Sequence, residues 1–361
     1  MSAAKRRVAY VFDEFENIVV SISGGKDSTV LAHLALLEAK RRNRRIGMFF
    51  LDEEVVYEST IQQIEYLLNL YPENTIPLWF QIEFKLTNAT SYKQGQLKCW
   101  EAGKHKIWMR SKHPISIKHK PWDSAKETIR NKNKGFGFYD VIENFQNSRP
   151  NTAFLVGTRA VESMNRWRAV SKNPGHKNCY WATKLNHGSA SFYPIYDWNF
   201  HDVWKYIYDE KLKYSRIYDY MWKRGLPFNE VRVSSLIHEK SFKALVELPE
   251  FEPKTYDRLL KRIDGISVGN LYGKDSTMLR ARKLPKNYEN WREYRDFLLA
   301  TYPDSEKKAI FEKRFSKHLD NDYVARQQCR QLVLNDYENN LPIDNKPDPR
   351  EKILEKWRNI L

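Results

Sequence analysis

The sequence predicts an α/β protein with a doubly wound parallel sheet flanked by helices. Short β-branched or apolar runs alternate with segments whose apolar residues recur at helical spacing, and this alternation is typical of βαβ units. A loop rich in glycine and hydroxyl side chains follows the first run, where such sheets bind phosphate. From residue 211 onward the pattern changes to basic amphipathic helices, which predicts a helical C-terminal region.

The elements of the α/β part can be assigned in order along the chain. The expected strands, which are rich in β-branched and aromatic residues, are residues 18–22, 46–51, 78–84, 153–156 and 191–195. The expected helices, whose apolar residues lie three and four positions apart, are residues 29–39, 61–68, 139–145 and 203–207. Strands and helices alternate through most of this region, so a parallel sheet is the natural arrangement.

The chain is predicted to contain two domains. Residues 1–208 form the α/β domain, with an insertion at about residues 88–151, and residues 209–361 form a basic helical C-terminal region. The insertion is rich in Lys, Trp, Gly and Pro, and has no clean periodicity before about residue 139. Structureless connections longer than roughly 15 residues are uncommon in compact domains unless they have a function. We therefore expect the insertion to carry function or recognition.

Composition excludes several classes of protein. The 361 residues include 41% hydrophobic and 29% charged residues, a globular balance that excludes wholesale disorder. No apolar stretch approaches the roughly 18 residues that span a bilayer, and no apolar signal core follows the N-terminus. Cys99, Cys179 and Cys329 lie far apart and predict neither a disulfide framework nor a Cys-x-x-Cys zinc site. These features predict a cytoplasmic protein with no membrane partner.

The net charge points to a polyanion as a possible partner. Sixty-one Lys and Arg against 45 Asp and Glu give a net charge of +16, which attracts nucleic acid, either DNA or tRNA. In the insertion, cations alternate with rings, as phosphate tracking and base stacking require; examples are Lys98, Trp100, Lys104, Trp108 and Lys120. Two other interpretations remain open. A nucleotide substrate alone explains a local positive site, and a charged lid has the same composition.

The loop between the first strand and the first helix contains the residues best suited to phosphate binding. Its sequence is Ser23-Gly24-Gly25-Lys26-Asp27-Ser28. The two glycines allow close backbone approach, the hydroxyls can donate to phosphate oxygens, and Lys26 can offset their charge. Asp27 makes sense as a helix-start residue or as a ligand of Mg²⁺ between phosphates. The spacing is neither that of a Walker loop nor Gly-x-Gly-x-x-Gly.

This loop resembles the PP-loop of the adenine-nucleotide α-hydrolase (ATP pyrophosphatase) superfamily, which includes PAPS (phosphoadenosine phosphosulfate) reductases, ATP sulfurylase small subunits and tRNA thiolation enzymes. Residues 51–60, 157–168 and 193–207 are similar to segments of its PAPS-reductase-like branch, in the same order. The resemblance covers about residues 17–208. It implies a Rossmann-like (HUP/PP-loop) fold that binds ATP or a PAPS-like adenine nucleotide together with Mg²⁺.

The resemblance also implies roles for individual residues. The expected nucleotide-binding residues are Ser23, Gly24, Gly25, Lys26, Asp27, Ser28, Asp52, Gly157, Arg159 and Arg166. Lys26, Asp27 and Arg159 are the expected catalytic residues, and Asp27 and Asp52 the expected Mg²⁺ ligands. Independently of the resemblance, a glycine at a strand end followed by several arginines can form a positive rim opposite the first loop. The alternative is a solvated helix start with an Arg–Glu pair.

The chain departs from the family pattern in its cysteines. Assimilatory PAPS and APS reductases share a C-terminal Cys nucleophile in a Glu-Cys-Gly-x-His-like tail, which this sequence lacks. Cys329 falls in the middle of an expected helix, so thiol-based reduction by the family mechanism is disfavoured. Some thiolation enzymes of the superfamily hold an iron–sulfur cluster on three Cys. We expect no such cluster here because no two Cys are separated by a short spacer.

The rest of the chain resembles a narrower group. Residues 100–110, 232–234, 248–256 and 287–291 are similar to PAPS-reductase-like proteins of the immunoglobulin-binding-regulator A type, often encoded beside a ParB-like nuclease. The resemblance thus implies a ParB-like partner. The leading functional hypothesis is action at the α-phosphorus of ATP, on or with nucleic acid. The alternatives are a PAPS reductase or sulfotransfer enzyme, and a nucleotide-sensing regulator without catalytic activity.

Overall fold

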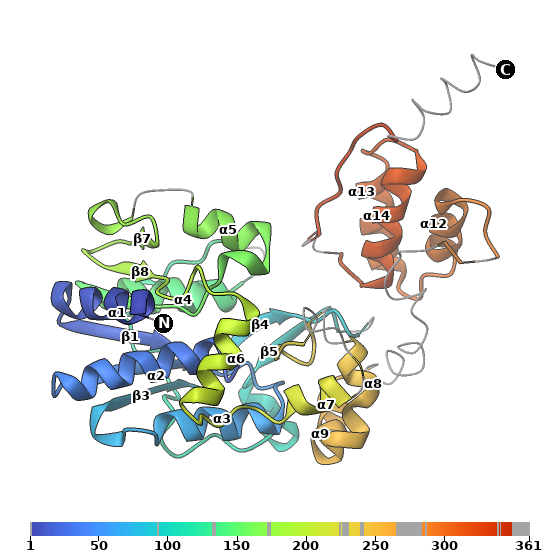
Figure 1. Ribbon diagram of the computed structural model, residues 1–361. Coiled ribbons are helices and arrows are strands. Elements are labelled where there is room, and N and C mark those ends of the chain that lie inside the picture. Colours follow the sequence, from blue (N-terminus) through green and yellow to red (C-terminus); the bar gives the residue numbers. More distant parts are fainter. Residues whose placement is uncertain are drawn as a thin grey trace. The chain divides into compact units, whose positions relative to one another are not determined.

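The computed structural model describes residues 2–91, 94–131, 135–171, 175–223, 225, 231–238, 242–264, 284–285, 287–337, 339 and 341–348 (Figure 1). A six-stranded sheet has the order β3-β2-β1-β6-β8-β7. Its strands are β1 (Asn17–Ser21), β2 (Ile46–Leu51), β3 (Thr75–Phe80), β6 (Thr152–Leu155), β7 (Ala182–Lys184) and β8 (Ala190–Phe192). Five strands are parallel, and only β7 runs antiparallel, to β8. The predicted fold class is therefore confirmed.

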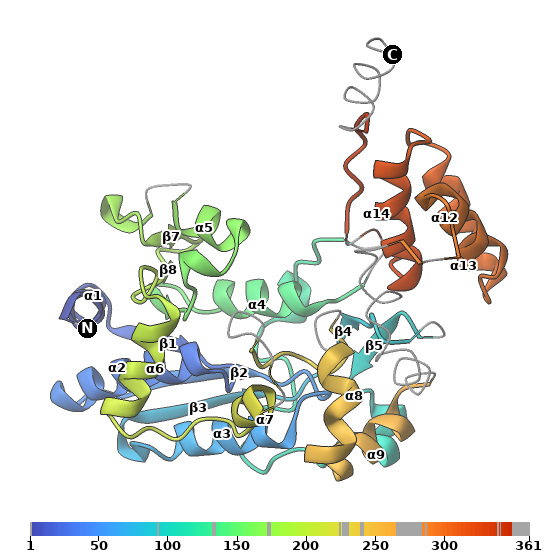
Figure 2. The ribbon, with the colours of Figure 1, turned by 45° about the vertical axis from the view of Figure 1, so that its right-hand side comes forward.

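Helices flank the sheet, as Figures 1 and 2 show. Those of the α/β part are α1 (Ser2–Glu14), α2 (Lys26–Arg41), α3 (Glu58–Leu68), α4 (Phe138–Asn147), α5 (Met164–Ser171), α6 (Phe200–Asp209) and α7 (Ile217–Lys223). All six residues of β2 are buried, as expected for a central strand covered on both faces. α2 buries most of its residues because it packs against the sheet, α1 and α6.

Most of the expected elements agree with the structure. The run at residues 78–84 covers the end of β3 and the start of a separate strand, β4 (Phe84–Thr87). Strands β5 (Gln96–Cys99) and β7 and helices α1 and α5 were not predicted. β5 and β7 are too short for a periodic pattern to stand out. The amphipathic α1 buries Ala4, Val8, Val11 and Phe12, which form a stripe at helical spacing.

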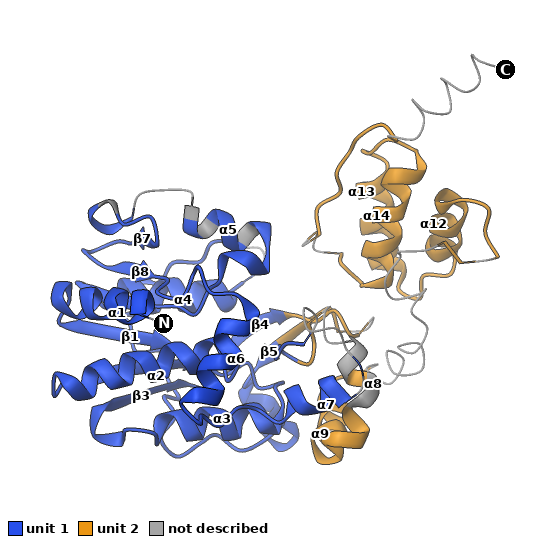
Figure 3. Cartoon of the chain, in the orientation of Figure 1, with its two compact units in different colours: residues 1–86, 98–235 blue, residues 87–97, 236–361 orange. Residues whose placement is uncertain are grey.

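The chain divides into two compact units, shown in Figure 3: residues 1–86 with 98–235, and residues 87–97 with 236–361. The boundary predicted after residue 208 falls inside the first unit, at the end of α6. The insertion at residues 88–151 is divided between the units. It contains β5, two 3-10 turns and α4, which packs on the sheet through Phe145, stacked on Phe49 at 4.5 Å between ring centroids.

The C-terminal part of the second unit is helical in its described residues, as predicted. Its helices are α8 (Phe242–Phe251), α9 (Pro253–Arg262), α12 (Trp291–Ala300), α13 (Ser305–Phe315) and α14 (Asp322–Val333). The last three begin where the side chains of Asn290, Asp304 and Asn321 accept backbone N–H groups as N-caps. α12 and α14 pack together. Within the described ranges, no helix is both long and apolar enough to cross a membrane.

Candidate nucleotide-binding site

All of the expected site residues except Asp52 lie in or just after the loops that follow β1 and β6, where the strand order of the sheet reverses. β1 pairs with β2 on one side and with β6 on the other. The chain leaves β1 through α2 toward β2, whereas β6 is paired on its far side with β8. The loops at the carboxyl ends of β1 and β6 therefore flank the topological switch point, where open α/β sheets bind their ligands.

Hydrogen bonds within the loop after β1 fix its shape. The Ser28 hydroxyl accepts the Ser23 N–H at 3.1 Å and donates to the Gly25 carbonyl at 3.0 Å. Gly24 has a φ of 71°, and a Cβ there would lie 2.8 Å from Cγ2 of Thr60 in α3. This backbone conformation and close approach both favour glycine. α2 begins directly after Gly25, so its first N–H groups and the positive end of its dipole face this loop.

Gly157 brings the loop after β6 against the loop after β1. A Cβ on Gly157 would lie 3.2 Å from the carbonyl carbon and oxygen of Asp27 and from the nitrogen of Ser28. These are backbone atoms at the start of α2, so they cannot move aside as a flexible side chain would. The close approach of the two backbones explains why glycine stands at this position.

We expect Gly157→Ala to push the two loops apart by a few tenths of an ångström and to weaken ATP binding by roughly ten-fold, since misplacing a site by about 1 Å costs up to 100-fold. Isothermal titration with ATP and Mg²⁺ measures the effect. Gly103→Ala is the matched control, because a Cβ there meets nothing within 4 Å. Equal ATP affinity in both variants would contradict the packing role of Gly157.

Two buried cations share one carboxylate between the loops. Lys26 is 5% exposed and Arg159 is 4% exposed. The Lys26 Nζ lies 3.2 Å from Oδ2 of Asp27, and the Arg159 Nε lies 2.6 Å from Oδ1. Burial lowers the pKa of Lys26, an effect that the charge of Asp27 opposes. The three residues expected to be catalytic therefore meet, although Arg159 is separated from the others by more than 130 positions of sequence.

The positive rim after β6 also contains a carboxylate. Glu162 forms ion pairs with Arg159 at 3.2 Å and with Arg166 in the next turn. Arg166 is half exposed, whereas Arg159 is buried. The helix-start Arg–Glu pair that the sequence left open is thus present, and it also places Arg166 near the cluster formed by Lys26, Asp27 and Arg159.

Sequence reasoning missed Tyr218 of α7. Its hydroxyl accepts the Lys26 N–H at 3.0 Å, and its ring centroid lies 5.6 Å from the Lys26 Nζ. Burial raises the pKa of Tyr218, so the hydroxyl stays protonated. The two residues are 192 positions apart, and no local spacing could reveal that contact. Tyr218 thus covers a backbone N–H at the start of α2 that phosphate loops normally present to the ligand.

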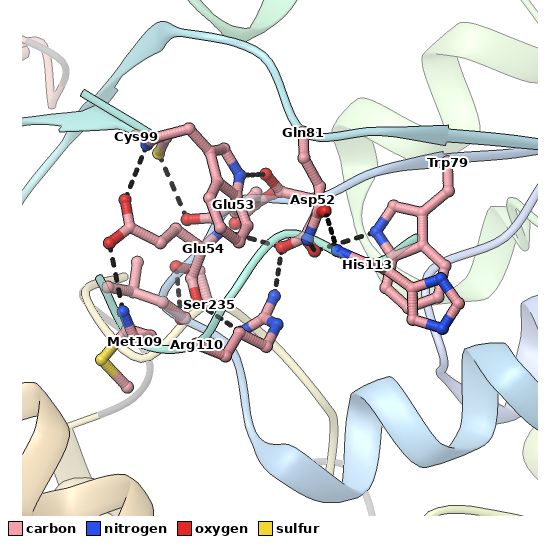
Figure 4. A network of polar contacts seen from close by, with 12 residues as sticks. Asp52, Glu53, Glu54, Trp79, Gln81, Cys99, Met109, Arg110, His113 and Ser235 are labelled. Carbon is pink, nitrogen blue, oxygen red and sulfur yellow. Dashed lines mark hydrogen bonds and ion pairs between the residues drawn. The ribbon is translucent and has the colours of Figure 1, made fainter. Parts of the chain in front are cut away.

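Asp52 lies in a different network, at the end of β2 (Figure 4). Its Oδ2 accepts hydrogen bonds from Trp79 Nε1 at 2.9 Å and Gln81 Nε2 at 2.8 Å. Its Oδ1 accepts the Glu54 N–H at 2.9 Å and pairs with the Arg110 guanidinium. Asp52 is fully buried, and these donors match the acceptor sites of one carboxylate. The metal role predicted for Asp52 would require some of these donors to be displaced.

The neighbouring carboxylates belong to the same network. Glu54, with a φ of 63°, accepts the Trp100 N–H at 2.7 Å. Burial, and secondarily the charge of Asp52, raises the pKa of Glu53 to about 7. Trp100 is fully buried and donates its Nε1–H to the Asp52 carbonyl at 2.7 Å. Trp100 therefore cannot serve as the base-stacking ring that the sequence suggested, because its faces are covered by protein.

The cysteines are placed in separate parts of the structure. Cys99 is buried and donates to the Glu53 carbonyl at 3.2 Å, whereas Cys329 is buried in α14 of the second unit. Burial raises the pKa of Cys329 to about 12, which keeps that thiol protonated and unreactive. In the part of the chain that the structure describes, no group of three or more His, Cys, Asp or Glu side chains could hold a metal ion.

The fold and the site define a parallel α/β protein with a PP-type loop at its switch point. The chain belongs to the phosphoadenosine phosphosulfate reductase domain family, whose model matches residues 17–224. Residues 225–328 match a domain of unknown function, DUF3440. The family domain covers β1 through α7, so it contains both loops and Tyr218.

Two curated relatives have no assigned function. Uncharacterized protein YbdN of Escherichia coli K12 is 27% identical over 317 residues, which cover 84% of this chain and 75% of the relative. Uncharacterized protein MJ0066 of Methanocaldococcus jannaschii is 25% identical over 219 residues, 60% of this chain and 37% of the relative.

Two solved structures are similar to this chain at low sequence identity. PAPS reductase from Candida auris, in a phosphate complex, has a TM-score of 0.37 and 13% identity, covering 60% of this chain and 84% of its own. The U34-tRNA thiolase NcsA from Methanococcus maripaludis, with its [4Fe-4S] cluster, has a TM-score of 0.32 and 15% identity, covering 73% of this chain and 80% of its own.

Proposed function

We propose that this protein binds an adenine nucleotide at the loops after β1 and β6 and acts at the α-phosphorus of ATP. The observation that carries the proposal is the pair of buried cations, Lys26 and Arg159, which converge on Asp27 at the switch point. Buried cations are costly unless an anion compensates them. Asp27 compensates both at once, and the phosphate oxygens of a nucleotide would share that role when they enter.

The site residues would divide the work as follows. The N–H groups of the first turn of α2 other than that of Lys26, together with the Ser23 hydroxyl, would bind phosphate oxygens. The Ser28 hydroxyl donates to the Gly25 carbonyl and would instead hold the loop in shape. Arg159, with Arg166 beyond it, would stabilise the charge that develops as an acceptor oxygen or sulfur attacks the α-phosphorus. The new bond forms at the α-phosphorus, the bond from it to the bridging oxygen breaks, and pyrophosphate leaves with the electron pair.

Mg²⁺ is the metal that this chemistry implies, and Asp27 fits as its ligand. The Asp27 Oδ1 is buried and forms an ion pair with Arg159, but it accepts no hydrogen bond from the described part of the chain. One or two carboxylates with the substrate phosphates are the usual protein ligands of Mg²⁺. Bound there, Mg²⁺ would neutralise phosphate charge. Asp52, with both oxygens accepting hydrogen bonds, is the less suited of the two predicted ligands.

Nucleic acid is the acceptor or partner that the charge favours. Residues 98–131 include exposed cations such as Lys104, Lys106 and Lys118, suited to phosphate contact. Lys112 is instead held over the rings of Trp108, at 5.1 Å, and Trp100, at 5.9 Å. The insertion thus offers cations more than stacking rings. Pairing with a ParB-like nuclease remains a prediction from the sequence resemblance.

PAPS is the alternative substrate, and it is supported by the family to which residues 17–224 belong. PAPS reduction by the family mechanism needs a reactive thiol. Burial of Cys329 in α14 raises the pKa of its thiol to about 12, which argues against that role. A regulator that binds nucleotide without turnover is the second alternative. The contact of Tyr218 with the Lys26 N–H favours the regulator hypothesis, because it couples the phosphate loop to α7.

The test is to incubate the purified protein with ATP and Mg²⁺, alone and with bulk tRNA or DNA, and with PAPS in parallel, and to separate products by ion-exchange chromatography. We expect AMP and pyrophosphate, increased by one of the nucleic acids. Release of adenosine 3′,5′-bisphosphate from PAPS would favour the reductase alternative. Nucleotide that is bound but unchanged in every reaction would favour the regulator and overturn the enzymatic proposal.

A further inference from the structure

A small aromatic pocket lies between α6 and α7, beside the phosphate loop. Its volume is about 120 Å³, and it is lined by Phe200, Trp204, Tyr214, Tyr218, Asp219, Trp222 and Val231. α6 starts at Phe200 because the Asn199 side chain accepts the Asp202 N–H as its N-cap. Neither the family resemblance nor the expected site residues assign a role to this pocket.

The pocket is joined directly to Lys26. The Lys26 Nζ lies 5.9 Å from the ring centroid of Phe200 and 5.6 Å from that of Tyr218. Tyr218 also accepts the Lys26 N–H at 3.0 Å. A ligand in the pocket would therefore touch the same side chains that surround the lysine of the phosphate loop.

The rings form walls at right angles. Trp204 lies 5.1 Å from Tyr214, with 90° between the ring planes, and 5.3 Å from Tyr218, with 87° between them. Trp222 is 55% exposed. Because neighbouring rings are perpendicular, a planar ring that enters the pocket can stack on the face of one ring and contact the edge of another.

Two of the residues that line the pocket carry a polar group that could form a further hydrogen bond. The Trp204 Nε1–H is buried and has no hydrogen-bond partner among the described residues. The Asp219 Oδ1 accepts the Tyr214 hydroxyl at 2.9 Å, which leaves acceptor sites on the carboxylate. A few polar groups on the residues of a largely aromatic pocket are typical of a site that orients a polar ring.

We propose that this pocket binds a nucleobase next to the phosphate loop, an inference that rests on the proposed function. Aromatic walls with a carboxylate could also attract a cation. However, Lys26 already places a positive charge near two of the rings, and a second cation would be repelled by it. A neutral heteroaromatic ring has no such cost. Its edge supplies an acceptor for the Trp204 N–H and a donor for Asp219.

The base could come from the adenine nucleotide itself or from a nucleic acid strand, and three probes separate these sources. Inorganic tripolyphosphate has no base and reports on the phosphate loop alone. ATP adds the adenine, and a short single-stranded oligonucleotide presents a base from a strand. Each is titrated against the full chain by isothermal calorimetry.

Two variants and a control test the pocket. Trp222→Ala removes a ring that is largely exposed, so the fold should not suffer. Trp204→Phe keeps a ring and removes the Nε1–H. Tyr208→Ala is the control, because Tyr208 is 83% exposed on the same helix, α6, and does not line the pocket. Thermal melting of each variant checks that it is folded.

We expect Trp222→Ala to weaken binding of ATP or of the oligonucleotide by roughly ten-fold, the scale of one base–aromatic stack. Trp204→Phe should weaken the same probe by about five-fold, the scale of one hydrogen bond. Tripolyphosphate should bind all four proteins equally. A loss with ATP identifies the nucleotide's own base, and a loss with the oligonucleotide alone identifies a base from a strand. Unchanged affinity for both base-containing probes in both variants would overturn the inference. If tripolyphosphate fails to bind the wild-type protein, the proposed function fails instead.

Discussion

Lys26→Met is expected to lower ATP turnover by at least ~100-fold, the usual effect of removing one group that stabilises transition-state charge. The Lys26 amine lies beside Asp27 at the start of α2, where the phosphates would bind. Methionine has a similar shape but no charge. Assays of AMP and pyrophosphate, with ATP titrations, measure the loss.

The same variant should be at least as stable as the wild type. Lys26 is buried, and burial lowers the pKa of its amine. Keeping the amine charged therefore reduces the free energy of unfolding. Asp27 keeps Arg159 as a partner when the lysine is removed. Lost activity with an unchanged or raised melting temperature is the behaviour of a functional site that is not optimised for stability.

Lys205→Met provides the matched control for this substitution. Lys205 is 66% exposed on α6 and forms an ion pair with Asp209 at the surface, and exposed pairs of this kind add little to stability. It should leave both turnover and stability near wild type. If Lys26→Met retained wild-type turnover, the assignment of the phosphate loop as the site of chemistry would be wrong.

Asp52→Asn should lower the free energy of unfolding by about 3–5 kcal/mol, the usual cost of removing one partner from a buried ion pair. The carboxylate is fully buried and accepts hydrogen bonds from Trp79, Gln81 and the Glu54 backbone while pairing with Arg110. An asparagine amide cannot accept on its nitrogen, so at least one buried donor would be left without a partner, and Arg110 would lose its counter-charge.

Denaturation by urea, with and without Mg²⁺, measures this effect and separates the two roles of Asp52. Asp13→Asn is the control, because Asp13 is 64% exposed in its pair with Arg42 and should change stability by less than about 1 kcal/mol. A loss of stability without added Mg²⁺ supports the structural role. Wild-type stability combined with lost Mg²⁺-dependent turnover would contradict it and favour the predicted metal role.

The separate networks of Asp27 and Asp52 show where local sequence reasoning stops. Both are acidic residues after a parallel strand, and both were expected to be Mg²⁺ ligands. In the structure, Asp27 faces Lys26 and Arg159, whereas Asp52 is enclosed by donors from β3 and residues 81–110. Which donors surround a carboxylate depends on the packing of distant segments, which has no signature in the spacing around it.

The sequence by itself determined the class of fold and the place of the glycine-rich loop between the first strand and the first helix, and it predicted that this loop and the segment around Arg159 form the site. Strand and helix periodicities, and the need for glycine at a left-handed or closely approached position such as Gly24, are local properties of the backbone. Only the tertiary structure decided that Tyr218 covers the Lys26 N–H, that Trp100 is buried, and that an aromatic pocket adjoins the loop. These features arise from contacts between residues far apart in the chain, and such contacts are set by how the helices pack on the sheet.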